Sequence, residues 1–207
     1  MTLPDTPRWV EANGIAADPT HWREELDGGY ALGHDAARLI VVVGHPTDLG
    51  DLAARHPEHV ILVDNPAIAP RPATRAILHT LPDPDALPDH EGAIPLPDDA
   101  PLPDELAQEL TWARGRGTVW TAYVDGAPGC FAYAPWRSKT LFDVSVDTVP
   151  SARQLGLATI VASTMIRAER AAGREPVWGA DEANLASMRL AARLGFVPTD
   201  EIWVCAP

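Results

Sequence analysis

The sequence has 207 residues, and its 46% hydrophobic and 22% charged residues are typical of a globular protein with one sizeable domain or two small ones. Its longest aliphatic run, Leu39–Val43, is far shorter than the ~20 residues of a membrane span. No basic segment followed by an apolar one, the pattern of a secretion signal, opens the chain. Two cysteines are too few for a disulfide scaffold or a four-cysteine zinc site. We therefore expect a cytoplasmic protein without membrane contact.

The net charge of −13 is unevenly distributed along the chain. Residues 1–110 hold six arginines against 20 acidic residues, a net charge of −14, whereas residues 111–207 hold ten basic and nine acidic residues. Nucleic acid requires a basic surface, so this balance argues against a nucleic acid partner. An acidic first half would favour a cationic substrate, although acidic surfaces also serve solubility alone. All seven histidines lie in the first half, so chemistry in the second half must work without imidazole.

Four elements are predicted in the first half: a strand over 38–43, a helix over 48–55 capped by Thr47, and strands over 59–63 and 73–78. Their alternation predicts a small α/β unit with a partly parallel sheet. Ten prolines between Pro66 and Pro103 predict turns and connectors and place a boundary near residues 80–100. We therefore divide the chain into an N-terminal α/β half, residues 1–90, and a C-terminal domain, residues 91–207.

The second half has clearer periodicity. The predicted elements, in order, are a helix over 104–114, strands over 118–124 and 129–134 around the turn Asp125-Gly126, a strand over 140–148, a long helix over 153–172, a short strand over 176–180, a helix over 183–194 and a strand over 196–204. Glycines follow both later helices, as is typical of helix ends. This order indicates a mixed, mainly antiparallel sheet with flanking helices, and hence an α+β or mixed α/β chain.

The segment between the third strand and the long helix is the most informative about function. In it, Arg153, Gly156 and Ala158 form the pattern Arg-x-x-Gly-x-Ala where a strand runs into a helix. Gly156 has no Cβ and Ala158 has only a methyl group, so a ligand can approach the main chain closely. The free N–H groups and the positive end of the helix suit a pyrophosphate, and Thr159 adds a hydroxyl donor.

A second segment lies at a suitable distance after this loop. It holds Asn184, Ser187 and Leu194-Gly195-Phe196, in the pattern Asn, two residues, Ser, then Leu-Gly-Phe. Together, the two segments make residues 104–205 resemble the GNAT superfamily of acyl-CoA-dependent N-acyltransferases. The resemblance implies a GNAT fold for the C-terminal domain. The first half resembles no specific family, and one interpretation is a degenerate GNAT-like copy, as in some two-part members of the superfamily.

The resemblance implies how acetyl-CoA, as the co-substrate, would be held. The strand that ends at Thr148 resembles one that splays from its neighbour and offers main-chain groups to pantetheine. The loop would hold the pyrophosphate, Asn184 would bond the pantetheine arm or the thioester side, and Ser187 would either assist it or cap and pack its helix. The predicted cofactor-binding residues are Val146, Asp147, Thr148, Arg153, Gln154, Leu155, Gly156, Leu157, Ala158, Thr159, Asn184 and Ser187.

The chain departs from the family at two positions that carry acid–base groups. Ala191 stands where many members have a tyrosine that protonates the thiolate, and Gly179 stands where some have a glutamate. An alkyl amine is mostly protonated at neutral pH, so a carboxylate must take a proton before the amine attacks the thioester. Asp143, and after it Asp147, are the candidate bases, because carboxylates inside an apolar strand need a reason. Ion pairs with nearby basic residues are the alternative.

Other polar residues have simpler interpretations. Asp181 and Glu182 are further carboxylates just before Asn184, and both are predicted to cap the helix that begins near residue 183. Tyr123 and Tyr133, both on predicted strands, could substitute as the thiolate acid, with packing as the alternative. His56 and His59 lie three residues apart without any further ligand motif, so no metal site is predicted.

These observations lead to one main functional hypothesis and two alternatives. The main hypothesis is an enzyme, an N-acetyltransferase that moves the acetyl group of acetyl-CoA to a primary amine of an unidentified small molecule or peptide, as a monomer or homodimer. The amine would attack directly in a ternary complex. The departures at Ala191 and Gly179 motivate the first alternative, a non-catalytic acyl-CoA-binding or regulatory module. The second alternative is a structural or interaction protein that keeps the fold without a ligand.

Overall fold

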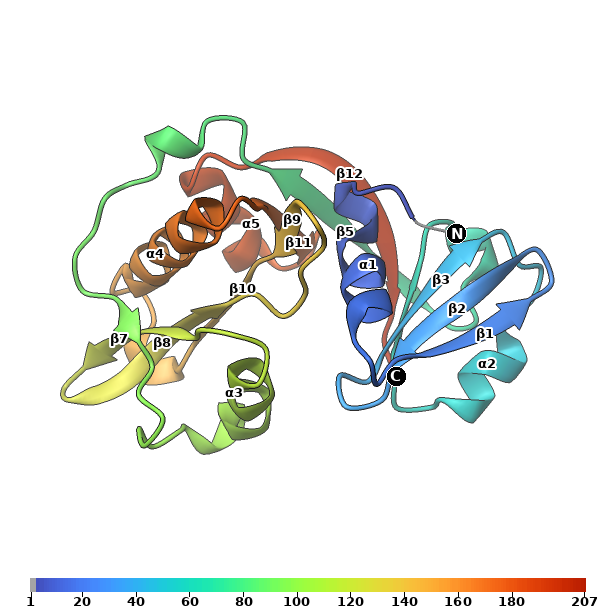
Figure 1. The fold of residues 1–207 in the computed structure, drawn as a ribbon, viewed down its shortest axis with the longest axis horizontal. Coiled ribbons are helices and arrows are strands. Elements are labelled where there is room, and N and C mark those ends of the chain that lie inside the picture. The colour runs from blue at the N-terminus through green and yellow to red at the C-terminus, as the bar shows by residue number, and fades with distance from the viewer. Residues whose placement is uncertain (1–2) are drawn as a thin grey trace.

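The computed structural model describes residues 3–207, which form two lobes joined by a shared β-sheet (Figure 1). The α-helices are α1 (Val10–Ala17), α2 (Gly50–Arg55), α3 (Ala107–Arg114), α4 (Leu157–Ala171) and α5 (Leu185–Arg193). The strands are β1 (Trp22–Leu26), β2 (Gly29–His34), β3 (Leu39–Gly44), β4 (Val60–Val63), β5 (Ala73–Thr80), β6 (Ile94–Pro95), β7 (Trp120–Val124), β8 (Ala127–Tyr133), β9 (Leu141–Asp143), β10 (Ser145–Thr148), β11 (Glu175–Asp181) and β12 (Val197–Cys205). The predicted mixed α/β class is confirmed. Among the described residues, every helix is too short or too polar to cross a bilayer.

Two sheets carry this fold. The larger has the strand order β1-β2-β3-β4-β12-β5-β11-β9, and the smaller has the order β10-β8-β7-β6. In the middle of the larger sheet, strands of the two lobes alternate, because β12 pairs with β4 and β5, and β5 also pairs with β11. The division of the chain at residue 90 stays a prediction, but the larger sheet runs across both halves without interruption (Figure 1).

The N-terminal lobe contains the predicted strands β3, β4 and β5 and the predicted helix α2, with β3 parallel to β4. Successive side chains of β3 point to opposite faces of the sheet. Val41 packs in the same cluster as Ile15 of α1, whereas Ile40 and Val42 pack in the same cluster as Leu52 of α2. Burial on both faces explains the continuous apolar run of this strand.

Sequence patterns missed three elements of this lobe, α1, β1 and β2, and misplaced one cap. β1 is an edge strand in which exposed side chains alternate with half-buried ones, so its hydrophobic signal is weak. β2 contains Gly33, where an added Cβ would lie 2.0 Å from the ring of Trp22. The close packing of Trp22 thus requires a glycine, which weakens the sequence signal for a strand. The expected cap at Thr47 was wrong, because α2 begins at Gly50 without a side-chain cap.

The C-terminal lobe contains all the predicted elements, with two corrections. The helix predicted over 153–172 begins only at Leu157, because residues 153–156 form the loop in which Gly156 has a left-handed conformation. Asp125 and Gly126 form the hairpin turn with positive φ angles of 51° and 82°, as the sequence predicts. The stretch 140–148 was predicted as one strand but forms two, β9 and β10, in different sheets. β9 is parallel to β11, and the Val144 N–H donates to the Val177 carbonyl at 3.0 Å. Beyond this bond, β10 pairs with β8 instead, so β10 and β11 diverge.

Different helices cover the two faces of the C-terminal lobe. α4 packs on one face, where its residues Met165 and Ile166 share a core with Phe142. α3 lies on the other face, and its Trp112 packs with Trp136 in the same cluster as α1. Successive side chains of β9 and β11 point to opposite faces of the sheet. Those that do not face α4 therefore face α1 and α3.

The two lobes repeat one order of elements. In each, a helix (α1 or α3) precedes three strands (β1–β3, or β7, β8 and β9–β10), a second helix (α2 or α4), a strand parallel to the third one (β4 or β11) and a last strand (β5 or β12). The C-terminal lobe adds α5 between its last two strands, where the N-terminal lobe has only a short 3-10 helix over Pro66–Ile68. Each last strand pairs with the parallel strand of the other lobe, β12 with β4 and β5 with β11. The topology of the molecule therefore has approximate twofold symmetry, with the β5–β12 pair at its centre.

Candidate functional site

The divergence of β10 and β11 opens a cleft of about 880 Å³ in the C-terminal lobe. Its walls are β10, the loop after it, the first turn of α4, part of β11 and one side of α5. Eleven of the twelve residues predicted to bind a cofactor line this cleft: Val146, Asp147, Thr148, Arg153, Gln154, Gly156, Leu157, Ala158, Thr159, Asn184 and Ser187. Leu155 is not among the lining residues, and its side chain is 56% exposed.

The loop before α4 has the backbone geometry of an anion-binding turn. Gln154 and Gly156 adopt left-handed conformations with φ of 63° and 79°. Gly156 directly precedes α4, and a Cβ added there would meet nothing within 4 Å. The first N–H groups of a helix have no partner within the helix. The start of α4 therefore presents main-chain donors and the positive end of its dipole to the cleft.

Arginines of α5 add positive charge to this cleft. Arg189 and Arg193 line it from positions four residues apart, which lie on the same side of a helix. With Arg153, they place three cations where the main-chain donors of α4 are found. The sequence analysis missed both α5 residues, although an arginine spacing of four on a predicted helix was a signal that could have found them.

Hydrogen bonds made by Asn184 and Ser187 stabilise the wall of the cleft that α5 and β11 form. The Asn184 side-chain oxygen accepts a hydrogen bond from the Ser187 N–H at 3.1 Å and caps α5, where Asp181 was expected. Asp181 instead accepts from the Ala183 N–H at 2.8 Å, one turn earlier. The Ser187 hydroxyl accepts from the indole N–H of Trp178 at 2.9 Å, and Trp178 itself lines the cleft. For Ser187, this geometry favours the packing interpretation.

Asp147 is joined to two other proton-bearing groups. The Tyr133 hydroxyl lies 2.8 Å from a carboxylate oxygen of Asp147 and 2.5 Å from one of Glu109 on α3. A hydroxyl has one proton, so Tyr133 can donate to only one of the two carboxylates at a time. Sequence patterns could not find Glu109, because it reaches the strand from a separate helix.

The surroundings of Asp147 favour the protonated form of its carboxyl group. Burial raises the pKa of the Asp147 carboxyl and the nearby charge of Glu109 raises it further, while the hydrogen bond from Tyr133 opposes the shift. Burial, followed by the charges of Asp147 and Glu109, raises the pKa of Tyr133, which is 1% exposed. Tyr133 therefore stays protonated at neutral pH. Tyr123, the other tyrosine considered, is 39% exposed and is not among the cleft-lining residues.

Asp143 has different surroundings. It is on β9, outside the residues that line the cleft, and faces Glu11 of α1, which packs against this strand. Burial raises the pKa of Asp143 to about 7. Burial, together with the charge of Asp143, raises the pKa of Glu11 to about 8. Burial therefore favours the protonated form of both carboxyl groups.

The two positions that depart from the GNAT pattern differ in their access to the cleft. Ala191 is fully buried within the core under α5, so it offers nothing to the cleft. Gly179 lines the cleft, and an added Cβ would only contact Leu78 at 3.5 Å. There is thus room for a side chain at Gly179, and the glycine leaves the cleft wider.

Comparison with known proteins agrees with this geometry. Residues 111–204 match the family model described as GNAT acetyltransferase. A GNAT-family protein from Novosphingobium aromaticivorans superposes with a TM-score of 0.70 at 19% identity, covering 97% of this chain and 95% of that one. A GCN5-related N-acetyltransferase-like protein from Streptococcus suis gives a TM-score of 0.62 at 18% identity, with 97% and 92% covered.

A third solved structure is a tandem GNAT protein from the clavulanic acid biosynthesis pathway. It superposes with a TM-score of 0.52 at 17% identity, covering 91% of this chain and 84% of that one. A search of curated proteins found no match. The family-model match and the shared fold confirm the resemblance to GNAT acetyltransferases that the sequence indicates.

Proposed function

We propose that this protein is an N-acetyltransferase that moves the acetyl group of acetyl-CoA to a primary amine by direct attack in a ternary complex. The carrying observation is the cleft between β10 and β11, which joins the open N-terminus of α4 with the carboxyl group of Asp147. An anion-binding turn and a proton acceptor in one cleft are what the transfer requires.

Acetyl-CoA would enter with its pyrophosphate at the start of α4. Main-chain N–H groups from Gly156 to Ala158 would bind the phosphate oxygens, and Arg153, Arg189 and Arg193 would balance their charge. The edge of β10 that faces β11 carries main-chain groups that β8 does not use, so the pantetheine amides could bond to it as a short strand would. The same groups are available to stabilise the oxyanion that forms at the thioester.

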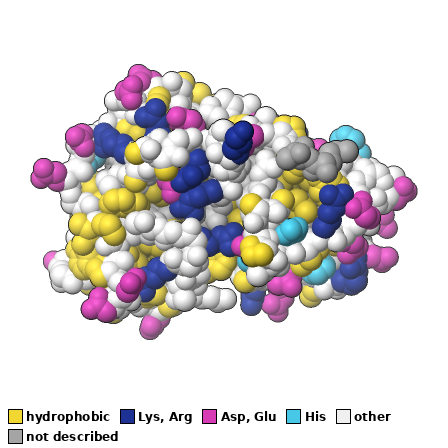
Figure 2. Space-filling view, viewed as in Figure 1, with side chains coloured by type: hydrophobic (Ala, Val, Ile, Leu, Met, Phe, Trp, Pro, Cys, Tyr) yellow, Lys and Arg dark blue, Asp and Glu magenta, His cyan; other side chains and the backbone are white. Residues whose placement is uncertain are grey.

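The acceptor side of the cleft is acidic, which supports a cationic amine. Glu105 lines the cleft, and Glu109 adjoins Asp147, so three carboxyl groups lie toward α3. On the face seen in Figure 2, by contrast, acidic side chains are spread along the periphery rather than gathered into one patch. The local group, more than the net charge of the first half, supports attraction of an ammonium substrate.

Asp147 would take the proton that the ammonium group must lose. Its raised pKa suits a group that works near neutral pH, and Tyr133 connects it to Glu109, which is exposed. The amine nitrogen then bonds to the acetyl carbon and the carbon–sulfur bond breaks. The second amine proton leaves as the tetrahedral intermediate collapses, and the departing thiolate takes a proton from solvent. Asp143, which is outside the cleft lining, is the second candidate base, because burial raises its pKa to about 7.

We also propose that the N-terminal lobe is a degenerate GNAT-like copy. The repeated order of elements and the exchanged last strands support a duplicated ancestor. The match to a tandem GNAT protein adds to this support.

Turnover with a panel of amines tests the proposed activity. Release of the CoA thiol would be measured with polyamines, amino acids and aromatic amines, and we expect the highest kcat/KM for an acceptor with two or more positive charges. Binding of acetyl-CoA without turnover of any amine would instead favour a non-catalytic acyl-CoA-binding module. The absence of an acid at Ala191 and Gly179 is the observation that motivates this alternative.

A further inference from the structure

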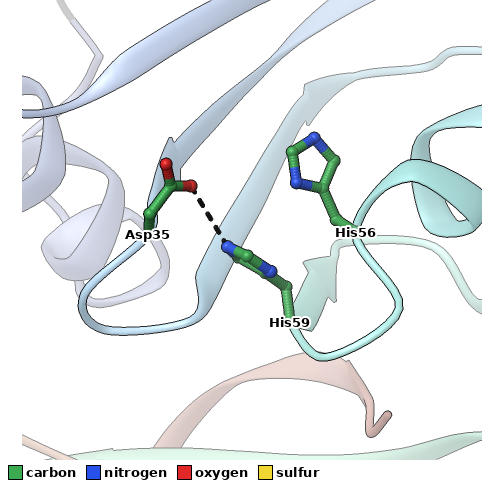
Figure 3. A group of neighbouring side chains, drawn as sticks. All are labelled: Asp35, His56 and His59. Atoms are coloured by element: carbon green, nitrogen blue, oxygen red, sulfur yellow. Dashed lines mark hydrogen bonds and ion pairs between the residues drawn. The ribbon is translucent and has the colours of Figure 1, made fainter.

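Three potential metal ligands converge in the N-terminal lobe, although the sequence pattern alone predicts no metal site (Figure 3). Asp35 lies just after β2, His56 directly follows α2, and His59 directly precedes β4. One ligand atom from each side chain lies within 4.8 Å of the other two. Because Asp35 is more than 20 residues from the histidines, only folding reveals the group.

The separation of two ligand atoms in the group is compatible with a shared metal ion. His59 Nε2 and a carboxylate oxygen of Asp35 are 3.3 Å apart and form a long hydrogen bond or ion pair. Two ligand atoms of a tetrahedral zinc ion, each about 2.0–2.1 Å from the metal, are themselves about 3.3 Å apart. A ring nitrogen of His56 points toward this pair from the third side (Figure 3).

Neighbouring residues hold the three side chains in place. The Trp22 indole N–H donates to Asp35 at 2.8 Å, and the Trp22 ring stacks on His56 with centroids 4.8 Å apart. The Arg71 guanidinium donates to the His59 carbonyl. A ligand set that its surroundings orient in this way loses little entropy when it binds an ion.

We infer that Asp35, His56 and His59 bind one divalent transition-metal ion of the zinc class. Two imidazoles and one carboxylate are donors that zinc accepts, and water would complete a tetrahedral set. None of the three residues lines the acyl-CoA cleft, so the ion would act on structure rather than on acyl transfer.

The corresponding place in the C-terminal lobe shows what such an ion would do. There, Arg137, from the connection between β8 and β9, pairs with Glu169 near the end of α4 at 2.6 Å. Arg174, just before β11, pairs with the same carboxylate at 2.8 Å. These ion pairs link the segment that follows β8 to the C-terminal end of α4 and the segment that follows it. A metal ion would link the corresponding segments of the N-terminal lobe, which follow β2 and α2.

Calorimetric titration of tag-free, chelator-treated protein with ZnCl2 tests the inference. We expect one Zn²⁺ per chain, a higher melting temperature with Zn²⁺ than without it, and quenching or enhancement of fluorescence from Trp22 that Trp22→Phe removes. His59→Gln and Asp35→Asn should each weaken Zn²⁺ binding at least tenfold. Asn at position 35 keeps an acceptor for the Trp22 indole, so this variant leaves the surrounding contacts in place.

His45→Gln is the matched control, because His45 is an exposed histidine of the same lobe outside the group. It should bind Zn²⁺ like the wild type. Acetyl-CoA binding, measured in every variant, reports whether the fold is intact independently of the metal. The inference is overturned if the wild type does not bind Zn²⁺, or if all three variants weaken binding equally, as scattered surface histidines would.

Discussion

The two lobes have the same order of elements, yet the cleft lies in the C-terminal one, and the residue before each second helix illustrates why. Before α2 this residue is Leu49, which is 2% exposed and packs with Leu52 and Val63 between helix and sheet. Before α4 it is Gly156, in a left-handed conformation with open space beside it. This segment is therefore packed against the sheet in the N-terminal lobe, whereas in the C-terminal lobe it leaves the main chain at the start of α4 accessible.

Asp147→Asn should have the largest effect on activity, because it removes the proposed proton acceptor while keeping the shape of the side chain. We expect kcat/KM to fall by about 10²–10⁴-fold, as is typical of the loss of a general base. The Kd for acetyl-CoA should stay within a few fold of the wild type. Steady-state kinetics alongside calorimetry measures both, and undiminished turnover would remove Asp147 from the mechanism. A larger loss in Asp143→Asn would transfer the role of the base to that residue.

Leu49→Ala should show that the N-terminal lobe acts as a support. Truncation of a buried leucine typically costs about 2–5 kcal/mol of unfolding free energy. Leu155→Ala, at an exposed leucine of the corresponding C-terminal segment, should change stability by less than about 0.5 kcal/mol. Urea denaturation compares the two variants. Equal effects on stability would show that burial does not distinguish these segments.

Glu11→Gln should change how stability depends on pH. The folded pKa values of Glu11 and Asp143, about 8 and about 7, lie above those of the unfolded chain, near 4. The folded state therefore binds protons that the unfolded chain has released, and stability falls as pH rises from about 4 to 8. At pH 8 the variant should melt above the wild type, by about 2–4 °C for each ~1 kcal/mol.

The difference between Glu11→Gln and the wild type should shrink as the pH approaches 4. Glu25→Gln, which changes an exposed carboxylate, is the matched control and should show no such trend. Melting curves followed by circular dichroism at several pH values would test this. A constant difference between Glu11→Gln and the wild type would contradict the raised pKa of Glu11.

Ser187→Ala should have the smallest effect. It leaves the Trp178 indole N–H without its acceptor and loosens one wall of the cleft, so we expect acetyl-CoA to bind about 3–10-fold more weakly. Ser187→Thr keeps the hydroxyl and should restore most of the affinity. If Ser187→Thr does not restore the acetyl-CoA affinity that Ser187→Ala loses, the Ser187 side chain does not act through its hydrogen bond with Trp178.

The sequence predicted best those features that depend on neighbouring residues. The glycine loop at Gly156, the turn Asp125-Gly126 and the long helix α4 each have a local signal, and all three are present, although α4 begins four residues later than predicted. The break at Val144 has no local signal, because β10 leaves β11 only when β8 is there to pair with it. The same limit applies to contacts between distant segments. Glu109 beside Asp147, and Asp35 beside His59, come together through the tertiary fold.

Titration of the protein with acetyl-CoA, compared among the wild type, Gly156→Glu and Gly126→Glu, tests the central claim most directly. Both glycines have a positive φ near 80° and open space around them, so the two substitutions carry the same backbone strain and charge, but Gly126 lies on a hairpin outside the cleft. We predict one micromolar site per chain, about −8 kcal/mol, in the wild type and in Gly126→Glu, and no binding in Gly156→Glu. Two sites per chain, or undiminished binding in Gly156→Glu, would contradict a single acyl-CoA site at the start of α4.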